Sequence, residues 1–288
     1  MRAAEVDGAG PMKDDVPAGD GWDGVWGPYG PPKARRIRSR VKKGIARIAA
    51  FGRSAKDASR GVAILAYHGT GERGSPWWVD FRGQMTLIED LGYRVVALGE
   101  AVDFVRNGAV LRQPTLAITF DDGFANNLDL AYPELARRGW PATVFLTTSW
   151  IGRRPYMSRE EVVALRGLGI EVGNHTHTHP RNLAALSPAA IRDEVTECSR
   201  RLEDLTGLRA RHFCYPNGQY DPRVRDAIAE TGLESACSGR VGFNAAGRDP
   251  FVLARLTIER GEGPRELRTR LAGGYDFLDV RQRRRDRV

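Results

Sequence analysis

Two adjacent carboxylates, Asp121 and Asp122, close an apolar run, Leu116-Ala117-Ile118-Thr119-Phe120, and Gly123 follows them. The run is typical of a short buried strand. Because neighbouring side chains of a strand point to opposite sides, the two carboxylates should point in different directions. Such a pair suits two tasks, holding a cation and moving a proton, since burial penalises both charges without a cationic partner. From this stretch alone, the alternative is that Asp122 caps a helix and Asp121 forms a salt bridge.

The second group of reactive residues is the cluster Gly173-Asn174-His175-Thr176-His177-Thr178-His179-Pro180, which holds three of the five histidines of the chain. His175 and His179 are four residues apart, so one helical turn would bring both imidazoles to one side. Two neutral imidazoles and one carboxylate form the open, three-ligand arrangement of catalytic zinc. Such an ion polarises a carbonyl and lowers the pKa of water. We expect His177 to face solvent without a role.

Strand and helix patterns alternate from Gly61 onward. The alternation predicts a parallel sheet covered by helices, and the length of the region favours a closed or nearly closed (β/α) barrel. Chemically useful residues all fall where strands are expected to end: His68, Asp121, Asp122, the histidine cluster and Tyr215. Barrels of this kind place their active sites at the C-terminal ends of their strands.

The formal net charge of +8 is distributed unevenly. Residues 33–60 hold eleven Lys and Arg against one acid, and residues 279–288 hold five Arg and two Asp, which leaves residues 61–278 nearly neutral. A nearly neutral main domain argues against a nucleic-acid partner, which would require a basic face. The three cysteines have no metal-site spacing and fit buried roles in a reducing compartment: Cys198, Cys214 and Cys237.

The composition predicts four segments: a disordered 1–32, a basic amphipathic helix and linker at 33–60, the barrel domain at 61–278, and a basic tail at 279–288. In the second segment, five apolar residues recur at helical spacing: Ile37, Val41, Ile45, Ile48 and Phe51. Through residues 33–52, this helix could lie on an anionic membrane surface or dock on the domain behind it. No signal peptide or membrane-spanning run is visible, which favours a cytoplasmic location with membrane association left open.

Three segments resemble the signatures of the polysaccharide deacetylases, the NodB-homology domain of carbohydrate esterase family 4. The first is Thr119-Phe120-Asp121-Asp122-Gly123, and the second is His175-Thr176-x-x-His179, followed by Leu183 and Leu186. The third, Phe213-Cys214-Tyr215-Pro216-Asn217-Gly218-x-Tyr220-Asp221, is similar to a variant among exopolysaccharide deacetylases. Together with Ala66-Tyr67-His68, the likeness covers about residues 61–260.

This resemblance implies a distorted (β/α) barrel that removes N-acetyl groups from the amino sugars of a polysaccharide or glycan. By the same analogy, the metal, usually zinc, would be bound by Asp122, His175 and His179. Asp121 would be the general base, and the backbone N–H of Tyr215 would help to hold the tetrahedral oxyanion.

One signature of the family is missing. No histidine follows His212, so the C-terminal Leu-x-x-His that supplies the general acid is absent, and Leu253-Ala254-Arg255-Leu256 occupies the corresponding region. Arginine does not donate protons near neutrality, because its pKa is about 12 or higher. Arg255 could instead pair with Asp121 and keep this base ionised. We expect His68 to take the acid role, which requires its imidazole to lie within about 8 Å of the metal pocket.

Two other functions fit the sequence less well. His175-x-His177 would also suit an amidohydrolase acting on a cyclic amide, but no later His or Lys is placed to complete that metal site. The missing acid would suit a non-catalytic glycan-binding module of the same fold. Four aromatic residues could stack on sugar rings or simply pack on the domain: Trp77, Trp78, Trp150 and Tyr156.

Overall fold

The computed structural model of this chain describes residues 32–108 and 110–279. By its contacts the chain divides into two units, residues 1–39 and 40–288, and each is described by itself. Apart from Pro32 and Asp279, the predicted disordered segment and basic tail lie outside the described residues. Helix α1 (Pro32–Ala50) spans most of the segment predicted to be a basic helix.

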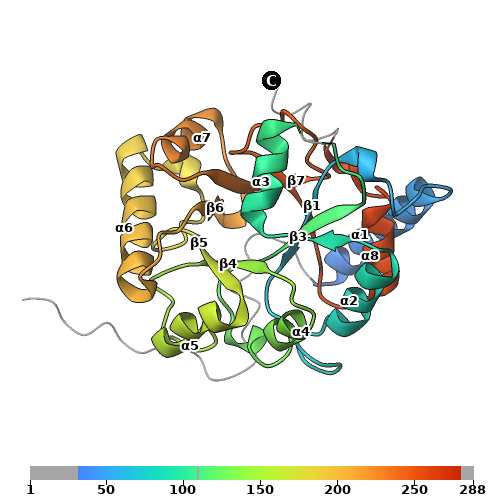
Figure 1. The fold of residues 1–288 in the computed structure, drawn as a ribbon, viewed down its shortest axis with the longest axis horizontal. Helices are drawn as coiled ribbons and strands as arrows, with labels where there is room; N and C mark the ends of the chain where they lie inside the picture. The colour runs from blue at the N-terminus through green and yellow to red at the C-terminus, as the bar shows by residue number, and fades with distance from the viewer. Residues whose placement is uncertain (1–31, 109, 280–288) are drawn as a thin grey trace, which may run out of the picture. The chain divides into compact units, whose positions relative to one another are not determined.

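Eight strands form one sheet in the order β1-β8-β7-β6-β5-β4-β3-β2, and every pairing is parallel. Seven strands close into a ring because β1 also pairs with β3, whereas β2 pairs with β3 outside the ring (Figure 1). The predicted (β/α) barrel is therefore confirmed. The strands are β1 (Ala63–Tyr67), β2 (Arg94–Val95), β3 (Thr115–Phe120), β4 (Ala142–Leu146), β5 (Ile170–Asn174), β6 (His212–Cys214), β7 (Ser235–Val241) and β8 (Leu253–Thr257).

Helices connect the strands and surround the ring (Figure 1). Three of them begin at the caps that the sequence predicts, because the side chains of Ser158, Ser187 and Asp221 each accept a backbone N–H of the first turn. The helices are α2 (Phe81–Asp90), α3 (Leu98–Asn107), α4 (Ala131–Arg137), α5 (Arg159–Ala164), α6 (Pro188–Thr206), α7 (Pro222–Ala229) and α8 (Pro264–Leu271). Short 3₁₀ turns are η2 (Ala58–Arg60), η3 (Ala125–Asn127), η4 (Leu165–Leu168), η5 (Leu183–Ala185) and η6 (Pro216–Gly218).

Side chains alternate between the outside and the inside of the ring along each strand. In β3, Leu116, Ile118 and Phe120 pack outward with residues of the helices, whereas Ala117 belongs to an interior cluster. Five of the other six ring strands, all except β5, contribute to this cluster through Ile64, Phe145, Cys214, Cys237 and Leu253. Two residues further along β3 and β8, the interior rows change from apolar residues to Thr119 and Arg255. The polar part of the interior therefore lies at the C-terminal end of the ring.

Helix α3 covers the opposite, N-terminal end of the ring. Arg106 donates a hydrogen bond to the carbonyl of Glu234, just before β7, and the Val105 carbonyl accepts the N–H of Gly247, before β8. The apolar side chains of α3 join the interior cluster: Leu98, Ala101, Val102 and Val105. Because this end is covered, the C-terminal end is the one available for chemistry.

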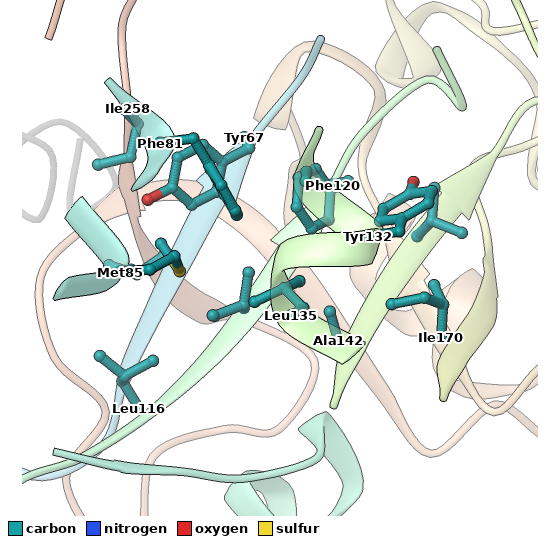
Figure 2. Packing of buried hydrophobic residues seen from close by; sticks show 14 of the residues in the cluster. Tyr67, Phe81, Met85, Leu116, Phe120, Tyr132, Leu135, Ala142, Ile170 and Ile258 are labelled. Carbon is teal, nitrogen blue, oxygen red and sulfur yellow. The ribbon is translucent and has the colours of Figure 1, made fainter. Parts of the chain in front are cut away.

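The outer core holds β1 and β3 side by side. The rings of Tyr67 and Phe120, which come from these two strands, stack at 5.5 Å between Phe81 of α2 and Tyr132 of α4 (Figure 2). The Tyr67 hydroxyl donates to Oε1 of Gln84 at 2.6 Å. This packing fixes the strand ends that carry His68 and Asp121.

Charged residues hold the C-terminal half of α1 against the segment after β8. Three ion pairs join them: Lys42–Glu259, Lys43–Glu262 and Arg47–Glu266. Glu262 is fully buried and is also bound by the guanidinium of Arg270 at 2.8–2.9 Å. Arg270 is itself buried, so this pair is shielded from water and salt.

We expect Glu262→Gln to lower the free energy of unfolding by about 3–5 kcal/mol, because the buried guanidinium of Arg270 loses its counter-charge. The matched control is Glu259→Gln, which removes an acid that is 40% exposed and should change stability by less than about 1 kcal/mol. Denaturant unfolding of both variants measures the two values. If both variants lowered the free energy of unfolding by less than about 1 kcal/mol, the buried Glu262–Arg270 pair would not stabilise the fold as we expect.

Candidate metal and catalytic site

Strained backbone is concentrated in the loops at the C-terminal end of the ring. Among the described residues, four non-glycine residues have a positive φ, and they follow β3, β5 and β6: Asp122 (72°), Thr176 (69°), His179 (58°) and Asn217 (56°). A residue other than glycine in this conformation costs about 1–3 kcal/mol, and such residues cluster at functional sites. Two of the four, Asp122 and His179, are predicted metal ligands.

Asp121 continues the interior row of β3, and its N–H donates to the carbonyl of Tyr67 on β1 at 2.9 Å. Arg255 of β8 donates from Nη1 and Nη2 to the two carboxylate oxygens of Asp121, at 2.7 and 2.8 Å. Both side chains are buried. Burial alone would raise the pKa of Asp121, but Arg255 outweighs burial and holds that pKa well below its ordinary value. The contact anticipated between these two residues is therefore present, and the carboxylate is ionised.

Asp122 points away from Asp121 because its positive φ turns the chain at the end of β3. Its Oδ1 lies 3.4 Å from Nε2 of His175 and 3.7 Å from Nε2 of His179. Zinc with ligands at about 2.0–2.2 Å in tetrahedral geometry separates neighbouring ligand atoms by about 3.3–3.6 Å. The distance to His175 lies in this range, the distance to His179 is slightly longer, and all three ligand atoms lie within 4.8 Å of one another, so the group could hold a zinc ion after a small adjustment.

The neighbours of His175 fix which ring nitrogen faces the cluster. Nδ1 lies 2.7 Å from the carbonyl of Cys214, and a carbonyl can only accept, so Nδ1 carries the proton. Nε2 faces Oδ1 of Asp122. Burial lowers the pKa of His175, but the hydrogen bond with Asp122 and the charges of Asp121 and Asp122 raise it overall, so a bound cation would replace the Nε2 proton. Metal-bound histidines typically have such a carbonyl partner on the second nitrogen.

The two histidines converge through a loop. The helical turn that we predicted between His175 and His179 is wrong, because residues 175–180 are not helical. Instead, Oδ1 of Asn174 accepts the N–H of Thr176, and the Thr176 hydroxyl accepts the N–H of His179. The ring of Trp150 then packs on His179 with 4.8 Å between centroids.

The protonation states of the cluster suit a cation. Burial first, and then the charge of His175, lower the pKa of His179 to about 4, which keeps this imidazole neutral. Burial raises the pKa of Asp122, but the hydrogen bond with His175 and the nearby histidine charges lower it overall. A carboxylate and a neutral imidazole at these distances fit a divalent ion such as zinc.

The match to a known family includes this cluster. Residues 109–236 match the family model described as polysaccharide deacetylase. Over these residues the chain is similar to the polysaccharide deacetylases. The matched residues include both carboxylates and the histidine cluster, but not His68 or Arg255.

The chain is similar to several members of this family. It is 25% identical over 182 residues to YxkH of Bacillus subtilis, provisionally named as a polysaccharide deacetylase, which covers 63% of this chain and 65% of YxkH. It is 32% identical over 132 residues to a chitooligosaccharide deacetylase of Bradyrhizobium sp. (strain ANU 289), which covers 44% and 56%. The chain thus spans less than two thirds of these relatives. The structure of IcaB from Ammonifex degensii has the same fold, with a TM-score of 0.66 and 24% identity over 75% of this chain and 97% of IcaB.

Tyr215 does not have the place that the family resemblance implies. Its backbone N–H donates to the carbonyl of Cys237 at 3.0 Å, within the pairing of β6 and β7. Its side chain belongs to the outer cluster with Phe213, and its hydroxyl donates to the carbonyl of Phe251. In this structure that N–H is therefore already bonded within the sheet, where it does not face the ligand group, and the Tyr215 side chain packs in the outer core.

The other two histidines of interest differ in position. His68 follows β1 in the interior row and is half-buried, and its charge lowers the pKa of both Asp121 and Asp122. Its carbonyl accepts the amide of Asn127. His177 instead bonds Oγ1 of Thr148 through Nδ1 at 2.9 Å and is outside the ligand group. The charge of His68 thus acts on both carboxylates of the candidate site, whereas His177 is bonded outside the ligand group.

Sequence reasoning missed three groups that position the ligands. Asn174 is fully buried at the end of β5. A polar residue at the end of a buried strand could have indicated, from the sequence alone, a side chain that positions its neighbours. The contact of the Trp150 ring with His179 was only weakly predictable, from the position of Trp150 in the loop after β4. The carbonyl of Cys214 had none, because a backbone group leaves no trace in the choice of side chain.

Proposed function

We propose that this chain is a zinc-dependent N-deacetylase, which hydrolyses the acetamido group of N-acetylated amino sugars in a polysaccharide or glycan. The observation that carries the proposal is the spacing of Asp122, His175 and His179 beside a separate buried carboxylate, Asp121. A purely structural ion-pair cluster has no need for a second carboxylate with its own arginine.

Each residue of the site has a distinct task in this proposal. Asp122, His175 and His179 would hold the ion, which would supply Lewis acidity toward the amide carbonyl and would lower the pKa of water. Asp121 accepts a proton from the attacking water, and Arg255 orients it. Because its pKa is lowered, Asp121 is a weak base. It could take a proton only from water whose own pKa is lowered, so it would have to lie next to the metal ligands.

Breaking the C–N bond requires a proton on the departing nitrogen, and we assign this proton to His68. Among the described histidines outside the ligand group, His68 is the one whose charge acts on both carboxylates. Water adds to the carbonyl carbon, the C–N bond breaks, and the nitrogen takes the proton from the imidazole. The products are acetate and a free amino sugar.

We expect His68→Gln to lower kcat by about 10²–10³-fold and to leave zinc content unchanged, because only the proton donor is lost. His177→Gln is the matched control and should keep activity and zinc, since this ring is outside the ligand group. Normal activity in the His68 variant would remove His68 from the mechanism.

Aromatic side chains form a row beside the ligands. Trp77, Phe124, Tyr156 and Trp150 contact one another at centroid distances of 4.4–5.0 Å, and Trp150 ends the row on His179. Trp77, Trp150 and Tyr156 are only half-buried. Half-exposed aromatic rings can pack on the apolar faces of sugar rings, which supports a carbohydrate substrate such as that named for the Bradyrhizobium relative.

The two alternative functions fit the site less well. An amidohydrolase would need His177 on the metal, but this ring bonds Thr148. A glycan-binding module would not need Asp121 to be ionised and buried beside the ligands.

The decisive experiment measures acetate released from N-acetylglucosamine oligomers before chelation, after chelation, and after zinc is added back. We expect release that is lost on chelation and restored by zinc. A chain that binds the oligomers and zinc but releases no acetate would contradict the enzymatic proposal and favour the binding module.

A further inference from the structure

The apolar stripe of α1 is exposed to solvent. The exposed fractions are 57% for Val41, 48% for Ile45, 78% for Ile48 and 91% for Phe51. These residues recur at intervals of three and four, so they share one face of the helix and its end. An amphipathic helix normally buries this face, but α1 presents it to solvent.

The opposite face of α1 is the one that contacts the barrel. Ala46 is fully buried there, and the three ion pairs to Glu259, Glu262 and Glu266 come from Lys42, Lys43 and Arg47. Turning the helix to bury the stripe would break all three ion pairs, one of which reaches the fully buried Glu262. The sequence left open whether the stripe docks on the domain behind it. In the structure it does not, because the stripe is exposed.

The charge of the segment identifies the kind of surface that would cover the stripe. Residues 33–53 contain nine Lys and Arg and no Asp or Glu. Four of the nine, Lys42, Lys43, Arg47 and Arg53, pair with acids of the barrel domain, and the other five lie between residues 33 and 40. A basic segment with an exposed apolar stripe has the composition of helices that lie in the interface of anionic membranes. A second copy of the chain is disfavoured, because a two-fold contact through the stripe would bring two such basic segments together.

We propose that α1 is a membrane-surface helix, which inserts Val41, Ile45, Ile48 and Phe51 into the headgroup region of an anionic bilayer. Among the described residues, no helix combines the length and the apolar content needed to cross a bilayer, so the contact is peripheral. Glu259 and Glu262, which hold α1, follow the C-terminal end of β8. The part of α1 around Lys42 and Lys43 is therefore held at the same end of the barrel as the candidate site.

The test is co-sedimentation of the full chain with extruded vesicles of phosphatidylcholine alone and of phosphatidylcholine with about 30% phosphatidylglycerol. We expect at least about tenfold stronger partitioning to the anionic vesicles, weakened by 0.5 M NaCl because salt screens the basic residues. The triple variant Ile45→Ser, Ile48→Ser and Phe51→Ser should bind the anionic vesicles at least about tenfold more weakly, since it removes the inserted apolar area.

The matched control removes three other exposed apolar side chains: Val110→Ser, Val163→Ser and Leu208→Ser. It should partition within about twofold of the unmodified chain, and circular dichroism should show both variants folded. Equal partitioning to neutral and anionic vesicles, no partitioning, or an unaffected triple variant would overturn the proposal. So would a dimer in analytical ultracentrifugation that the triple variant converts to monomer, because the stripe would then be a self-association surface. None of these outcomes depends on acetate release.

Discussion

Replacing His175 with alanine should reduce acetate release by at least about 10³-fold, an increase of roughly 4 kcal/mol in the activation barrier. The reason is that one of three ligands is lost from a site whose chemistry depends on the ion. Zinc content, measured by atomic absorption after dialysis, should fall with activity.

A matched control for the loss of a buried histidine is His212→Gln. His212 is fully buried at the start of β6 and bonds Oγ of Ser235, away from the ligand group. This variant should keep its zinc and, once folded, its activity. An alanine variant of His175 that retains stoichiometric zinc or full activity would refute the ligand assignment.

Asp121→Asn should remove activity without removing the metal. We expect kcat to fall by about 10²–10⁴-fold, because the base is lost while the three ligands remain. The free energy of unfolding should also fall by about 3–5 kcal/mol, since Arg255 keeps its buried charge without a partner. A binding module would instead keep its affinity for N-acetylglucosamine oligomers in this variant, with no activity to lose.

The pair itself can be measured by a double-mutant cycle. Arg255→Met leaves the Asp121 carboxylate buried and unpaired, whereas the double variant Asp121→Asn with Arg255→Met leaves neither charge. We expect the double variant to be more stable than the sum of the single losses predicts, because the two penalties share one cause. Additive losses would show that the two side chains do not interact.

The pH dependence of stability follows from the lowered pKa of Asp121. The native state holds this proton less tightly than the unfolded chain does, so the stabilisation is present above the unfolded pKa of about 3.9 and is lost as the pH falls through the native pKa. The difference in unfolding free energy between the unmodified chain and Asp121→Asn should therefore narrow below about pH 4. A difference that stays constant in that range would contradict the ionised pair.

Local patterns predicted local structure well. The apolar run Ala142–Leu146 forms strand β4, and Ser158, Ser187 and Asp221, which are residue types that favour helix N-caps, begin α5, α6 and α7. Between β3 and β4, a local helical pattern over about 126–138 would favour one continuous helix, but the structure has η3 followed by α4. Asn127 is fully buried there and bonds Thr70 and the carbonyl of His68, and this long-range contact outweighs helical propensity.

The sequence by itself determined the alternation of strands and helices, the strand ends and the residue types of the site, because strand periodicity and capping depend on neighbours in the chain. Only the tertiary structure decided that Tyr215 packs outward, that a loop brings His179 to His175, and that α1 exposes its stripe. Arg255 and Asp121 are 134 residues apart and come from strands that both flank β1. Such contacts form when the ring closes, and ring closure depends on how all seven strands pack together, which no local pattern contains.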